Sequence, residues 1–288
     1  MIWGASIAWY LFLAGAAAGA FFTSALVETK YPDNRTLRLA GRIIAPVFVT
    51  IGLILLMVDA EAGFKNPLRF IHLLANPGSV MTLGVYVLSI FMVVSYAAAI
   101  LELMKKKLPV WLKWIGIISA FGVAIYTGFL LGVVKTYPLW NNSLLPILFT
   151  ASAFSSGLAA TSLVGLLCDR KDFEHMWLIK KSHVVLVSLE AVLLATMLII
   201  TSYASYEGAQ SVAMMISGKY AVEFWLGIAI FGLLLPFIIE GIPVFITKRI
   251  ETSTFTLVVS VIGEGGVIVG GFLLRYIIIM AVVPVVFV

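Results

Sequence analysis

The chain has 288 residues, of which 62% are apolar and 11% are charged, and its mean hydropathy is +1.10. Soluble domains carry about 25% charged residues, so this composition excludes an ordinary soluble protein. It indicates a multi-pass membrane protein embedded in the lipid bilayer, with no separate soluble domain. The net charge of +5 does not indicate a nucleic-acid partner, because the basic residues follow a membrane-topology pattern.

Eight apolar runs are long enough to cross a membrane, which takes about 20 residues of helix. They do not alternate with period two as the strands of a membrane β-barrel do, so we predict an all-α fold. The first run lacks a preceding basic segment and is too long for a signal peptide, so it counts as a span. The runs are 5–27, 41–58, 82–103, 114–134, 145–167, 183–202, 221–246 and 254–283.

Basic residues concentrate in every second connection between these runs. The connections after spans 1, 3, 5 and 7 hold 14 of the 19 lysines and arginines, whereas those after spans 2, 4 and 6 hold four. Cytoplasmic loops of membrane proteins are enriched in lysine and arginine. We therefore predict that the odd-numbered connections are cytoplasmic and that both termini lie outside.

Small residues recur in spans 1 and 5. Gly15 and Gly19 lie on one helical face, and helix packing is the simplest interpretation of that spacing. Span 5 can be aligned on span 1 with an offset of 137 residues, which places Ser152 and Ser156 at the positions of these glycines. This weak repeat predicts two four-helix bundles, formed by residues 1–134 and 135–288.

The connection between spans 2 and 3, residues 59–81, holds a cluster of charged residues outside the basic connections. Within 14 residues it contains Asp59, Glu61, Lys65, Arg69 and His72. We interpret this segment as part of a mouth on the outer face, where a redox carrier or substrate meets the membrane.

Ionisable residues inside spans are costly and mark function by default. Glu190 and Glu264 cannot easily reach an interface, and Arg275 could pair with an outer acid such as Glu223 or Asp59. Three further groups near inner helix ends are expected to extend to water, namely Glu102, His183 and Glu240.

Aromatic residues mark the outer end of span 4. Tyr137 and Trp140 are expected in the interfacial belt. Tyr126 lies deeper, so its hydroxyl needs a hydrogen-bond partner or a ligand.

The sequence does not contain the usual ligand sets of redox metals. The three histidines, His72, His175 and His183, offer no facing pair for a membrane haem. Cys168 is the only cysteine, whereas an iron–sulfur cluster is usually held by four. The sequence also lacks a phosphate-binding loop. We therefore expect no haem, cluster or other metal in this chain, and any redox chemistry requires a partner.

Several stretches together resemble the NrfD/PsrC family, the membrane subunits of polysulfide reductase-like complexes. They are YLFLAGAAAGAF in span 1, PLRF and NPGSVMTLG after span 2, YTGFLLG in span 4 and PLWNNSLLPILF entering span 5. The resemblance runs along nearly the whole sequence. It implies a multi-pass protein of the prokaryotic cytoplasmic (inner) membrane, a subunit of an oxidoreductase complex of anaerobic respiration.

The resemblance also implies a site for a quinone, menaquinone or ubiquinone, near the outer face. It implies a [4Fe–4S] subunit and a molybdopterin catalytic subunit as partners. Tyr126 matches the quinone-contacting tyrosine of span 4, and Asp59 and Arg69 match the polar motif after span 2. A relative has a histidine near the outer end of span 1, where this protein has Tyr10, so the proton acceptor is left open.

Our hypothesis is that Tyr10 and Tyr126 hydrogen-bond the ring oxygens of the quinone. His72 or Asp59 exchanges protons, since histidine titrates near neutral pH. Arg69 orients Asp59 or favours a developing negative charge on the ring oxygen. Two alternatives stay open. A secondary transporter would need helices interrupted at mid-membrane, for example at the prolines of span 7 or the glycines of span 8. A pure membrane anchor would have no quinone chemistry.

An inner proton path is the second part of the hypothesis. Glu190 and Glu264 would belong to it, and the complex would then couple redox work to proton translocation.

Overall fold

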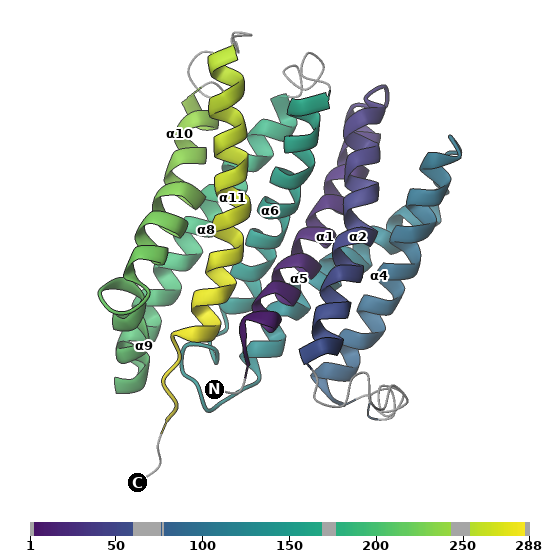
Figure 1. Ribbon diagram of the computed structural model, residues 1–288. Helices are drawn as coiled ribbons and strands as arrows, with labels where there is room; N and C mark the ends of the chain where they lie inside the picture. The colour runs from purple at the N-terminus through teal and green to yellow at the C-terminus, as the bar shows by residue number, and fades with distance from the viewer. Residues whose placement is uncertain (1–2, 60–75, 77, 169–176, 243–253, 286–288) are drawn as a thin grey trace.

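The structure is a computed structural model, and it describes residues 3–59, 76, 78–168, 177–242 and 254–285. In these ranges the chain is helical and contains no strand, as predicted (Figure 1). The elements are α1 (Ala5–Lys30), α2 (Arg35–Asp59), α4 (Val80–Leu103), α5 (Val110–Gly132), α6 (Leu145–Cys168), α8 (Trp177–Ala204), α9 (Tyr206–Ile216), the π-helix η1 (Glu223–Leu234), α10 (Leu235–Ile242) and α11 (Thr254–Met280).

Eight helices of the described ranges are long and apolar enough to span a membrane, and they coincide with the eight predicted runs. The seventh span is η1 continued by α10, covering Glu223–Gly241. The sequence did not predict α9, which has 11 residues and is too short to span. Ser205 caps this helix, because its hydroxyl accepts a hydrogen bond of 3.0 Å from the Gly208 amide.

The centre of the molecule is formed by α1 and α6 (Figure 1). Their apolar windows are 89% and 78% buried, whereas those of the other spans are between 28% and 56% buried. Both helices are apolar on all sides, as expected for helices surrounded by other helices. The α1 helix packs on α2, α5, α6 and α11, so it links the first four spans to the last four.

Glycines allow α1 and α6 to approach closely. A Cβ atom at Gly19 would lie 2.9 Å from the Phe154 Cα atom, and one at Gly157 would overlap the backbone of α1 at Gly19 and Ala20. Since real Cβ atoms do not tolerate such contacts, these positions require glycine. The prediction that the glycines of span 1 serve helix packing is therefore confirmed.

The connection between α5 and α6 folds over the end of the bundle. Trp140 is 1% exposed, its ring stacks on Trp3, and its Nε1 donates a hydrogen bond of 2.7 Å to the Ile278 carbonyl. Tyr137 is also buried. The interfacial-belt interpretation of Tyr137 and Trp140 is therefore wrong, because these rings pack against protein.

Helices of the last two spans are continuous where they are described. The α11 helix runs through Gly263, Gly265 and Gly266 without a break, and Pro236 lies within α10, directly after η1. Pro243 lies outside the described residues. The interrupted helix expected of a secondary transporter is thus absent from residues 223–242 and 254–280.

The start of α1 and the end of α11 lie at the same end of the bundle (Figure 1). This agrees with an even number of spans. The placement of the termini outside stays a prediction, as does the division into residues 1–134 and 135–288.

Candidate functional site

The two tyrosines predicted to bind quinone lie together near the end of the bundle that carries the termini. Tyr10, on the second turn of α1, is 1% exposed, and Tyr126, near the end of α5, is half-buried. Their hydroxyl groups interact electrostatically, but the Tyr10 hydroxyl lacks a hydrogen bond of acceptable geometry. Buried hydroxyls are nearly always hydrogen-bonded, so this one is a candidate for contact with a ligand.

A glycine on α4 makes room for the Tyr126 ring, and a glycine on α2 lies beside Tyr10 in ordinary contact. A Cβ atom at Gly84 of α4 would overlap the ring and hydroxyl of Tyr126. On α2, a Cβ atom at Gly52 would lie 3.6 Å from Cδ2 of Tyr10. We call these four residues, Tyr10, Gly52, Gly84 and Tyr126, the tyrosine cradle. Gly84 was not singled out from the sequence, although it is the last residue of the NPGSVMTLG stretch.

Asp59 lies beyond this region, at the end of the bundle where α1 starts and α11 ends. It is the last residue of α2, it is exposed, and it follows Gly52 by seven residues. Seven residues are about two helical turns, or roughly 10 Å along the axis on the same face. Asp59 therefore lies closer than the cradle to this end of the bundle. The other predicted residues of this segment, Arg69 and His72, lie outside the described residues.

A second polar site surrounds Arg275 of α11, whose side chain is fully buried. Its Nη1 donates hydrogen bonds of 3.0 Å to the Ser152 hydroxyl and 2.7 Å to the Gly271 carbonyl. Its Nη2 donates to the Phe149 carbonyl at 3.3 Å, and the guanidinium lies 5.1 Å from the centre of the Phe149 ring. Gly15 of α1 leaves the space, because a Cβ atom there would be 3.0 Å from Nη2.

Glu190 of α8, which is also buried, is the acid that interacts electrostatically with Arg275, although the two side chains make no direct salt bridge. Ser152 interacts with both groups and connects them. The expectation that Arg275 pairs with Glu223 or Asp59 is therefore wrong. The reason is that Arg275 points into the interface of α1, α6 and α8 rather than towards the end of the bundle.

A third cluster lies near the other end of the bundle. The Nδ1 atom of His183 lies 2.9 Å from Oε2 of Glu240 and 3.4 Å from Oε2 of Glu264. His183 and Glu264 are buried, and Ser162 of α6 interacts with Glu264. His183 and Glu240 therefore do not extend to water as expected, because each carries a partner from another helix. The donor atoms of the three residues lie within 4.8 Å of one another, close enough to share a proton or a cation.

Buried polar groups connect the second and third clusters. Glu190 and His183 are seven residues apart on α8, so they share a face at roughly 10 Å, and they interact electrostatically. On α6, the hydroxyls of Ser155, Ser156 and Ser162 are buried without a hydrogen bond of acceptable geometry. We call the following set the polar track: His183, Glu240, Glu264, Glu190, Arg275 and the buried serines of α6. The sequence predicts a proton path at Glu190 and Glu264, but it predicts that His183 and Glu240 extend to water and assigns the serines of span 5 no polar role.

Comparisons with known proteins agree on one family. The family model described as "Polysulphide reductase, NrfD" matches residues 1–286. The C subunit of polysulfide reductase from Wolinella succinogenes is 32% identical, over 96% of the present sequence and 94% of that protein. The NrfD homologue of Haemophilus influenzae is 30% identical over 98% and 94%, and NrfD of Escherichia coli is 28% identical over 83% and 84%.

Removing Arg275 should destabilise the protein through the charge left on Glu190. Breaking one partner of a buried pair costs about 3–5 kcal/mol, so Arg275→Met should lower Tm strongly. The double variant Arg275→Met/Glu190→Gln should recover part of this loss, because no charge is then buried alone. Thermal unfolding of the full-length protein in mild detergent measures the Tm of the wild type, the single variant and the double variant.

The exposed Lys135 provides the control, since Lys135→Met should leave Tm nearly unchanged. A double variant no more stable than Arg275→Met would contradict the pairing of Arg275 with Glu190.

Proposed function

The protein belongs to the NrfD family of polysulfide reductase-type membrane subunits, and we propose that it exchanges electrons between the quinone pool and an outer-face iron–sulfur subunit. The observation that carries this proposal is the tyrosine cradle. It presents the buried hydroxyl of Tyr10, whose contact with the Tyr126 hydroxyl does not form a well-aligned hydrogen bond, at the end of the bundle where α2 ends and the polar segment begins.

The chemistry of a quinol sets the requirements for such a site. A quinol supplies two electrons and two protons when it is oxidised, so the site needs groups at both ring oxygens and a route for protons to water. Tyr10 and Tyr126 would donate hydrogen bonds to the ring oxygens. The absence of a side chain at Gly84 leaves the space that the Tyr126 ring occupies. Asp59 would take up protons at the exposed rim, with His72 and Arg69 assisting.

Partners with metal centres would complete the electron path. The proposal assigns a [4Fe–4S] subunit to the outer face, together with a molybdopterin catalytic subunit. Support comes from the Wolinella succinogenes relative, whose name identifies it as one component of a multi-subunit polysulfide reductase. The single cysteine of this sequence cannot provide the usual four ligands of a cluster. The cytoplasmic membrane of a prokaryote is the location that this arrangement implies.

The polar track is proposed as a path for protons from the opposite side. It leads from Glu240, His183 and Glu264 to Glu190 and Arg275 through the buried hydroxyls of α6. Groups that share protons within hydrogen-bond distance can pass them on, whereas isolated buried charges cannot. The path would couple quinone chemistry in the first four spans to proton uptake through the last four.

The cradle can be tested at Gly84. Gly84→Ala should displace the Tyr126 ring and Tyr126→Phe should remove its hydroxyl, so both should lower quinol-dependent dye reduction by about tenfold or more. The assay uses the full-length tagged protein with its co-purifying subunits, and iron and molybdenum are measured in the same sample.

A matched control is Gly132→Ala on α5, where a Cβ atom would make only an ordinary contact at 3.9 Å with the Trp140 carbonyl. It should leave turnover unchanged. A metal-free preparation without quinol activity would contradict the proposal. Variants of Gly84 and Tyr126 with normal turnover would favour a membrane anchor without quinone chemistry.

The polar track can be tested at Glu264. Glu264→Gln removes its ionisable group but keeps its size, so protons translocated per quinol should fall in proteoliposomes while metal content stays normal. Glu207→Gln, on α9 and remote from the track, is the control. Equal proton translocation by wild type and Glu264→Gln would show that the track carries no protons.

A further inference from the structure

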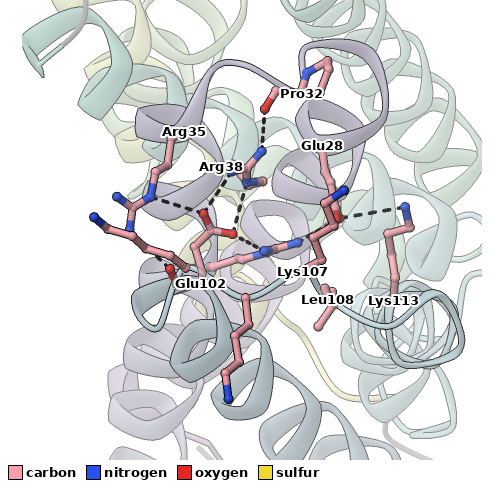
Figure 2. Close-up of a pocket in the computed structure, with 11 residues that line it drawn as sticks. Glu28, Pro32, Arg35, Arg38, Glu102, Lys107, Leu108 and Lys113 are labelled. Atoms are coloured by element: carbon pink, nitrogen blue, oxygen red, sulfur yellow. Dashed lines mark hydrogen bonds and ion pairs between the residues drawn. The ribbon is translucent and has the colours of Figure 1, made fainter.

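A basic cavity lies at the end of the first four spans that is opposite the tyrosine cradle. Its volume is roughly 560 Å³, and it is formed by the ends of α1 and α2 and by the connection from α4 to α5 (Figure 2). Seven basic side chains and two carboxylates line it. The lining residues are Glu28, Pro32, Arg35, Arg38, Arg42, Glu102, Lys105, Lys106, Lys107, Leu108 and Lys113.

The two carboxylates are already shared among several cations. Arg38 and Arg35 approach Glu102 at 3.1 Å and 3.6 Å (Figure 2). Arg42, which is buried, also pairs with Glu102. Glu28 pairs with Arg42 at 2.8 Å and lies 3.8 Å from Lys113. Glu102 is thus buried within the protein, and the expectation that it extends to water is wrong.

Positive charge remains in excess after these pairs are counted. Arg42 is 2% exposed, and its Nε atom has no hydrogen-bond acceptor among the described residues. The neighbouring Lys105, Lys106 and Lys107 line the same cavity and make no ion pair within the described part of the chain. A buried donor without an acceptor, beside three more cations, is the environment that an anion would stabilise.

The backbone holds these lysines at the cavity. Lys105 has a φ of 56°, which is uncommon for a residue other than glycine. It ends α4 in a left-handed turn, where the Lys106 amide donates a hydrogen bond of 2.9 Å to the Leu101 carbonyl. This turn places the lysines directly after the last helical turn, which contains Glu102.

An apolar groove adjoins the basic cavity. It has a volume of roughly 420 Å³ and runs between α2 and α6. Arg35 lines both the cavity and the groove. The other lining residues are mostly apolar, namely Thr36, Leu39, Ala40, Ile43, Ile44, Val164 and Cys168.

We propose that the basic cavity and the apolar groove together bind one anionic phospholipid. Its phosphoryl group would accept hydrogen bonds from Arg35, Lys106 and Lys107, and one acyl chain would lie along Ile43 and its neighbours. Arginine suits phosphate because its planar guanidinium donates two parallel hydrogen bonds, and basic pockets between membrane helices bind lipid head groups. A free phosphate would satisfy the cavity but would leave the groove without an occupant.

Lipid retention by the full-length protein with its co-purifying subunits tests this proposal. Native mass spectrometry would compare dioleoyl phosphatidylglycerol with dioleoyl phosphatidylcholine, and inorganic phosphate would be titrated separately. The wild type should retain phosphatidylglycerol in preference. Lys106→Gln/Lys107→Gln, which breaks no ion pair, should weaken that retention on the order of tenfold.

Two further variants distinguish lipid binding at this site from a general effect of surface charge and from binding of free phosphate. Lys30→Gln/Lys181→Gln changes the charge equally, at basic connections outside the cavity, and should retain the lipid normally. Ile43→Trp adds volume in the groove and should weaken phosphatidylglycerol retention without changing phosphate binding. Equal retention of both lipids, or equal loss in the two double variants, would overturn the proposal. Binding of inorganic phosphate without phosphatidylglycerol would overturn the lipid assignment.

Discussion

Burying charge in a membrane bundle is the constraint on which the rest of this structure depends. A charged side chain in the hydrocarbon region must find its partners within the protein. Here the partners come from other helices: Arg275 of α11 is balanced by Glu190 of α8, and Arg42 of α2 pairs with Glu102 of α4. These interactions therefore link spans that are distant in the sequence. Glycine at the crossing of α1 with α6 provides the close approach that brings the partners together.

The two ends of the bundle differ in chemistry. The end that carries the termini has the tyrosine cradle and the exposed Asp59, whereas the opposite end has the basic cavity and the cluster around His183. Quinone chemistry is proposed for the first four spans and proton transfer for the last four. The α1 helix contacts both α6 and α11, and it carries Tyr10 of the cradle as well as Gly15, which lies beside Arg275. One helix therefore connects the two sites.

Much of the fold could be predicted from the sequence, because hydropathy and run length report directly on membrane spans. The eight spans and the burial of Glu190 and Glu264 are confirmed. Partners were harder to predict, since His183 and Glu264 meet only after α8 and α11 pack together. The same reason explains the errors at Arg275, Glu102 and Trp140. A hydropathy average reports how apolar a segment is, but it does not report which helix packs against that segment.

The most direct test of the account is photolabelling of the purified complex with an azido-substituted quinone, followed by mapping of the labelled peptides. The account predicts labels on α1 near Tyr10 and on α5 near Tyr126. It also predicts that an excess of unlabelled quinol, present during irradiation, prevents this labelling. Labels confined to α8 or α11, or labels that persist in the presence of quinol, would contradict the assignment of the cradle as the quinone site.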